Sequence, residues 1–182
     1  MRPSPEEMYV STAVETRTGF SKESVIEFSE LRNEPQWLRD WRLAAWETYE
    51  SLPFPARTDE EWRRTDLRAL KLDRFAPWAA TGQTVDSLEG VISPDSAGSA
   101  QAGIVVQRDA STIYSHAENL PEGVIFTDLT TAVEKHPDLV KQYLMTQAVP
   151  VNFGKFEALH AAFWQGGSFL YVPKGKSVEL PF

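Results

Sequence analysis

The chain has 182 residues and a mass of 20.5 kDa, with 18 basic and 26 acidic side chains and a formal net charge of −8. Hydrophobic residues make up 42%, which excludes wholesale disorder. The acidic balance argues against nucleic-acid binding, because phosphate contacts need clustered lysine and arginine, and the lack of cysteine excludes a disulfide or a cysteine-held cluster within this chain.

No targeting or membrane-spanning segment is visible. The first ten residues carry Pro3, Pro5, Glu6 and Glu7 and no apolar run, unlike a secretory signal. No stretch approaches the ~20 apolar residues that cross a bilayer. We therefore expect a cytoplasmic protein without membrane contact, in which residues 1–20 form a flexible tail.

Two helices are expected next. Ser21 is a suitable N-cap, and Val25, Phe28 and Leu31 follow on one helical face. The second helix begins at Pro35, which is favoured in a first turn, and ends before Pro53. Its apolar stripe comprises Leu38, Trp41, Ala45, Thr48 and Leu52, and its expected solvent face comprises Arg39, Asp40, Arg42, Glu47 and Glu50.

Four tryptophans gather around this second helix: Trp37, Trp41, Trp46 and Trp62. Tryptophan at helical spacing is typical of a packed core, which is the favoured interpretation. Tryptophan is also enriched among the anchors of protein interfaces, and the first three cannot all point one way on a single helix. The sequence does not decide which of the four are exposed.

The segment from residue 58 to 103 is less regular. Thr58 and Glu61 are spaced as a capping box, so the acidic run Asp59–Glu61 is expected at a helix start. Residues 93–103 are rich in serine, glycine and alanine and are expected to form a loop.

Strand and helix signals alternate in the second half of the chain. Strands are expected over residues 103–107, 112–114 and 124–126. Asp128 and Pro137 each begin an expected helix. A third helix is expected over 155–164, stopped by the glycine pair that follows it.

Residues 168–182 have β character. Val178, Leu180 and Phe182 alternate as in a half-buried strand, up to the last residue. A strand of this kind needs a partner, because burying each large apolar side chain is worth about 1.5–3 kcal/mol. We therefore expect this chain to be the front part of a longer protein.

A nucleotide site at Gly175-Lys176-Ser177 is disfavoured. The phosphate-binding loop that these residues resemble needs a glycine where Leu170 stands. It also needs a following helix, whereas Pro181 and an alternating pattern follow here. A β-turn with solvated lysines is the better interpretation.

The three histidines, His116, His136 and His160, are at least twenty residues apart and lack the i, i+4 spacing of a metal pair. Structural roles are favoured for all three. Ser115-His116 lacks the acid and the oxyanion hole of a catalytic triad, and nothing marks Asp59–Glu61 as a catalytic carboxylate pair. No residue is therefore assigned a catalytic, cofactor-binding or metal-binding role.

Several stretches are informative through their order along the chain. They are Glu34–Leu38, Leu52–Pro55, Glu61–Thr65, Pro121–Val124, Asp128-Leu129, His136-Pro137, Lys155–Leu159, Ala162–Gly167, Phe169–Gly175 and Val178–Pro181. Together they resemble the SufB/SufD family of iron–sulfur cluster assembly proteins, over most of residues 21–182. The Trp62 stretch and the compact start are closer to SufD than to SufB.

This resemblance implies a non-enzymatic scaffold subunit that works with a SufB-like subunit and a SufC-type ABC ATPase. It implies an α+β fold with a tail over 1–20, an N-terminal α+β domain over 21–150 and the start of a truncated right-handed parallel β-helix over 151–182. The family's cluster-related residues lie later in the β-helix, so none carries over and no cofactor is expected in this segment.

Two other classes of protein stay open. One is an enzyme with a β-helix core that acts on polysaccharide, which would need acidic pairs beyond Phe182. The other is a plain protein-interaction module that uses Trp37 or Trp46 on a partner.

Overall fold

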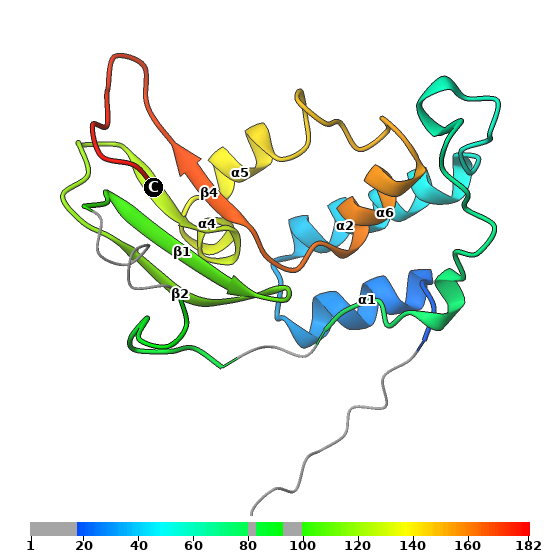
Figure 1. The fold of residues 1–182 in the computed structure, drawn as a ribbon, viewed down its shortest axis with the longest axis horizontal. Helices are drawn as coiled ribbons and strands as arrows, with labels where there is room; N and C mark the ends of the chain where they lie inside the picture. Colours follow the sequence, from blue (N-terminus) through cyan, green and yellow to red (C-terminus); the bar gives the residue numbers. More distant parts are fainter. Residues whose placement is uncertain (1–17, 80–82, 93–99) are drawn as a thin grey trace, which may run out of the picture.

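The computed structural model describes residues 18–79, 83–92 and 100–182. Helices α1, α2 and α6 gather at one end, and the strands gather with α4 and α5 at the other (Figure 1). In chain order the elements are α1 (Lys22–Leu31), α2 (Gln36–Ser51), the short 3-10 helices η2 (Glu60–Trp62) and η3 (Leu72–Arg74), β1 (Gly103–Arg108), β2 (Ser111–Ala117), β3 (Ile125–Asp128), α4 (Leu129–Lys135), α5 (Pro137–Tyr143), α6 (Lys155–Phe163) and β4 (Ser168–Tyr171). This mixture confirms the α+β class.

The local signals for helix starts are confirmed. The Ser21 hydroxyl accepts a hydrogen bond from the Ser24 amide at 3.1 Å and so caps α1. The Asp128 carboxylate caps α4 in the same way, accepting from the Thr131 amide at 2.9 Å. Pro137 is the first residue of α5, where its missing N–H costs nothing.

The core of the helical end joins α1, α2 and α6. It consists of Val25, Phe28, Ala45, Trp46, Leu159, Ala161, Ala162 and Phe163. Helix α6, expected to belong to a separate region from residue 151 onward, thus shares the core of the first two helices. Phe20, expected in the tail, packs the edge of its ring on Phe163 at 5.1 Å between centroids.

A second core lies between α2 and the strand-bearing end. Leu38 of α2 packs there with Ala132 and Val133 of α4, Val140 of α5, and Trp164. Helix α2 therefore contributes to both cores and links the two ends of the molecule.

Both described sheets are two-stranded and antiparallel. β1 pairs with β2, with a register shift between Val106 and Gln107, and Ile125–Asp128 of β3 pairs with β4. Within the described ranges no strands pair in parallel, so a parallel β-helix starting in residues 151–182 stays a prediction.

The expected strand over Val178–Phe182 is wrong. These residues fold back toward β1 and β3, where the Ala102 amide donates to the Pro181 carbonyl at 2.8 Å. The Phe182 ring packs on Phe126 at 4.4 Å. Pro181 has no N–H to donate to a ladder, and Leu180 stays 47% exposed.

The capping box at Thr58 and Glu61 is also wrong. Asp59 turns its carboxylate back to the Ala56 amide at 2.8 Å, and η2, which has no side-chain cap, is a three-residue 3-10 helix. Residues 1–17 of the expected tail and 93–99 of the expected loop lie outside the described ranges. Among the described helices, none has the length and apolar character needed to cross a membrane.

The four clustered tryptophans differ in burial. Trp46 is 5% exposed, which confirms the core interpretation for this residue. Trp37, Trp41 and Trp62 are half-buried. The Trp46 ring contacts Tyr49 and Phe163, at 4.8 and 6.0 Å between centroids.

Replacing Trp46 by alanine should therefore lower the free energy of unfolding by about 3–5 kcal/mol, because it leaves a cavity between α2 and α6. Urea denaturation followed by circular dichroism measures this loss. Trp62→Ala is the control and should cost less, since its half-buried ring contacts mainly Phe156. Equal losses in the two variants would contradict the placement of Trp46 in the core.

Candidate functional site

An arginine is fully buried where the two cores meet. Arg42, expected on the solvent face of α2, has 0% of its side chain exposed, which overturns that expectation. It lies between Leu38 and Ala45 on the buried stripe of the helix. Burial is possible because the guanidinium forms a two-pronged ion pair with Glu34, from Nε to Oε2 at 2.7 Å and from Nη2 to Oε1 at 2.8 Å.

Two further Arg42 donors bind the end of α6. Nη1 donates to the Ala162 carbonyl at 3.1 Å, and Nη2 donates to the Trp164 carbonyl at 3.0 Å. The guanidinium also lies over the rings of Phe28 and Trp164, 4.8 and 4.4 Å from their centroids. Burial lowers the pKa of Arg42, while the hydrogen-bonded Glu34 acts in the opposite direction, and an arginine stays charged at neutral pH.

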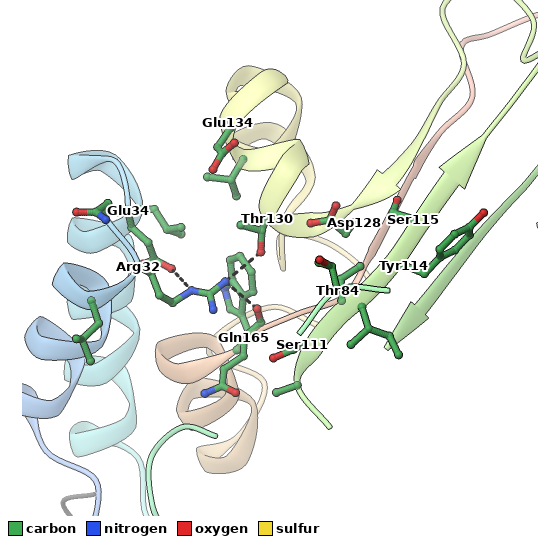
Figure 2. A pocket seen from close by; sticks show the side chains of 18 of the residues that line it. Arg32, Glu34, Thr84, Ser111, Tyr114, Ser115, Asp128, Thr130, Glu134 and Gln165 are labelled. Atoms are coloured by element: carbon green, nitrogen blue, oxygen red, sulfur yellow. Dashed lines mark hydrogen bonds and ion pairs between the residues drawn. The ribbon is translucent and has the colours of Figure 1, made fainter. Parts of the chain in front are cut away.

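A second arginine extends this network to the strand-bearing end. Arg32 places Nε 3.4 Å from the Glu34 carboxylate. Its Nη2 donates to the Thr130 hydroxyl and to the Gln165 carbonyl, both at 3.0 Å (Figure 2). Arg32, Glu34 and Arg42 thus connect the α1–α2 turn, α4 and the segment that leaves α6.

Helices α2 and α6 each supply a cation to the carboxyl end of the other. While Arg42 of α2 binds the last carbonyls of α6, Lys155 at the start of α6 donates to the Tyr49 and Leu52 carbonyls, both at 2.7 Å. The two helices are therefore antiparallel. Positive charge at a helix carboxyl end is favourable because it opposes the helix dipole.

A cavity of about 720 Å³ opens beside this network. Its walls are the α1–α2 turn, residues 84–86, residues 110–115 around the start of β2, and the first turns of α4, with Trp164 and Gln165 between them (Figure 2). The charged residues that line it are Arg32, Glu34, Asp86, Asp128 and Glu134. A volume of this size falls within the ~300–1,000 Å³ that is usual for ligand sites.

The residues considered in the sequence as possible catalytic or metal-binding groups do not gather at this cavity. Ser115 lines it, but His116 is the next residue on β2 and pairs with Glu118 at 3.0 Å. His136 joins α4 to α5, as expected of a residue at a helix end. Among the described residues, no three histidine, aspartate or glutamate side chains cluster as metal ligands would.

The turn expected at Pro173–Gly175 is confirmed, and the acidic run Asp59–Glu61 makes local contacts. Residues 173–176 form a turn, in which the Lys176 amide donates to the Pro173 carbonyl at 3.1 Å, and no helix follows. Asp59 caps a local turn, and Glu60 pairs with Arg63 at 3.1 Å.

His160 is the histidine with the most perturbed surroundings. It lies on an exposed side of α6, yet partial burial of the ring and the positive charge of Arg42 lower its pKa from the usual 6.5, against an opposing effect of Glu157. Beside it lies a smaller cavity, which Trp78, Asp109 and Gln165 also line.

Comparison with known proteins gives consistent matches over nearly the whole chain. The family model described as the SufBD protein N-terminal region matches residues 31–182. The chain is 36% identical over 177 residues to the iron-sulfur cluster assembly protein SufD of Bacillus subtilis, with 91% of this chain and 38% of that protein covered. It is 32% identical over 180 residues to SufB of the same organism, covering 90% and 37%.

A third relative is an iron-sulfur cluster assembly SufBD family protein of Staphylococcus epidermidis. It is 30% identical over 177 residues, which cover 90% of this chain and 37% of that protein. The chain thus spans about 38% of the length of the curated relatives that it matches.

Replacing Arg42 by methionine should lower the free energy of unfolding by about 3–5 kcal/mol, because it leaves the Glu34 carboxylate and two carbonyls buried without their donor. Chemical denaturation measures the change. Arg39→Met is the matched control, since Arg39 pairs with Glu30 at the surface at 3.2 Å and such pairs are worth about 0–1 kcal/mol. Similar small losses in both variants would contradict a structural role for Arg42.

The folded chain should lose stability as the pH falls through about 6.5. Because the pKa of His160 is lowered in the folded chain, the unfolded chain binds a proton at this residue more tightly than the folded chain does. A falling pH therefore favours unfolding, until the pH is low enough to protonate His160 in the folded chain as well. The free energy of unfolding, measured by urea titration from pH 7.5 to 5, should fall less steeply in His160→Gln. Parallel pH profiles for the two proteins would contradict this assignment.

Proposed function

Because the chain belongs to the SufBD family, we propose that it is the N-terminal part of a SufD-type subunit that takes part in iron–sulfur cluster assembly. The observation that carries this proposal is the family match over residues 31–182. The SufD type is supported by 36% identity to SufD against 32% to SufB, and a SufB-type subunit is the second candidate.

In this proposal the segment is a non-catalytic part of a scaffold that works in the cytoplasm with a SufB-like subunit and a SufC-type ATPase. Two features support a structural role. The chain has no cysteine thiolate to hold iron, and its one fully buried charged side chain in the described ranges, Arg42, binds helix carbonyls and Glu34.

The proposal also keeps a β-helix core next to β4. Leu170 and Val172 support it, because these apolar side chains are 49% and 42% exposed on and just after β4, whose partner among the described strands is β3 alone. Stacked β-helix coils bury such side chains only against neighbouring coils.

A hybrid protein tests the function. This chain would replace the matching N-terminal 38% of Bacillus subtilis SufD in cells depleted of that protein. The hybrid should restore the activity of the host's iron–sulfur enzymes and copurify with SufB and the ATPase, whereas SufD without its N-terminal part should do neither.

The equivalent hybrid with SufB separates the two candidates. Rescue by the SufB hybrid alone would assign the chain to the SufB type. A role in cluster assembly would be contradicted if both hybrids accumulate as folded proteins and neither restores enzyme activity.

A further inference from the structure

We propose that the 720 Å³ cavity beside β2 is a docking site for an extended segment of a partner protein that carries lysine or arginine side chains. Three independent features of the wall carry this inference: the unpaired indole N–H of Trp164, a strand edge that forms no second ladder among the described strands, and two exposed carboxylates. The inference does not depend on the proposed role in cluster assembly.

A buried N–H donor at the cavity has no acceptor within the described chain. It is the indole Nε1 of Trp164, a residue that lines the cavity and is 4% exposed, so this group gains little from bulk solvent. Leaving a buried donor without an acceptor is unfavourable, so a ligand that presents a carbonyl oxygen would gain from this group.

The edge of β2 at the cavity already accepts one backbone hydrogen bond from outside its hairpin. The Val85 amide donates to the Ile113 carbonyl at 2.9 Å, and residues 84–86 and 111–115 line the cavity together. β2 pairs only with β1 among the described strands, so its second edge forms no ladder with another of them. An unpaired edge in a cavity is suited to the addition of a further strand, in which backbone hydrogen bonds supply affinity.

The charge of the cavity selects the occupant. Asp86 and Glu134 are exposed at its lining, and neither has a cation partner among the described residues. Glu34 is paired with both Arg42 and Arg32, and Asp128 is occupied by the Thr131 amide and hydroxyl, at 2.9 and 2.7 Å. The free carboxylates therefore favour cationic side chains, while Leu31, Leu38 and Val133 supply apolar surface for their neighbours.

An anionic or a purely apolar ligand fits these groups less well. A phosphate or carboxylate in the cavity would be repelled by the carboxylates of Asp86 and Glu134, which line it. An apolar ligand would leave the Trp164 indole N–H unpaired. A basic, extended peptide suits both the indole N–H and the carboxylates, because each residue brings a carbonyl acceptor and some of its side chains bring a positive charge.

The test uses the uniformly ¹⁵N-labelled 182-residue chain and a blocked pentapeptide of alternating valine and lysine. Amide shifts should concentrate at Ile113, Ser115 and Thr130, and the indole N–H signal of Trp164 should move downfield as it gains an acceptor. The matching peptide of valine and glutamate should bind at least about tenfold more weakly. A lysine peptide with methylated backbone nitrogens should bind more weakly too, because it cannot extend the strand.

Substitutions of the two exposed acidic residues test whether their charge contributes to peptide binding. Asp86→Asn with Glu134→Gln should weaken binding of the lysine peptide about fivefold, as expected for the loss of two exposed ion pairs. The matched control is the double variant Glu89→Gln with Glu122→Gln, which removes two exposed carboxylates that do not line the cavity. This control should leave binding of the lysine peptide unchanged.

The inference would be overturned by shifts that map away from the cavity, by equal binding of the lysine and glutamate peptides, or by no binding at millimolar peptide. Full affinity of the methylated peptide would overturn strand addition. None of these results bears on the hybrid-protein test of cluster assembly, because that test measures enzyme activity in cells.

Discussion

A positive charge in the interior of this protein is tolerable only when it is well paired, and Arg42 meets that condition. Its four hydrogen bonds join Glu34 before α2 to the Ala162 and Trp164 carbonyls at the end of α6. The Born cost of burying an unpaired ion amounts to several kcal/mol even after relaxation. The position of α6 on α2 is therefore restricted to the geometry in which these bonds form.

Other features of the fold follow from this restriction. Lys155 binds the opposite end of the helix pair, so α2 and α6 are held at both ends. The chain leaves the network at Trp164 and passes close to the β1–β2 turn at Gly166, where a Cβ atom would lie 2.7 Å from the Ala110 carbonyl oxygen. Glycine is thus required for close approach at this point, and not only as a helix stop. The cavity lies where the helical and strand-bearing ends meet along this path.

Short-range signals in the sequence predicted much of this fold. Ser21, Asp128 and Pro137 mark helix starts because caps act within three residues, and the β1–β2 hairpin follows from local alternation. The order of short sequence motifs along the chain predicted the family. Arg42 was missed because its charge suggested solvent, although its spacing from Leu38 and Ala45 placed it on the buried stripe. Its carbonyl partners lie 120 and 122 residues away, so local patterns do not reveal them. The cavity likewise depends on contacts between distant segments.

Hydrogen exchange of the arginine Nε–H protons, observed by ¹⁵N-edited NMR at neutral pH, tests the central claim most directly. The buried, paired guanidinium of Arg42 should give an Nε–H signal that exchanges with water far more slowly than that of Arg68, whose side chain is 81% exposed. Exchange of the Arg42 proton as fast as that of Arg68 would contradict the account, because it would show that the charge on α2 is open to solvent.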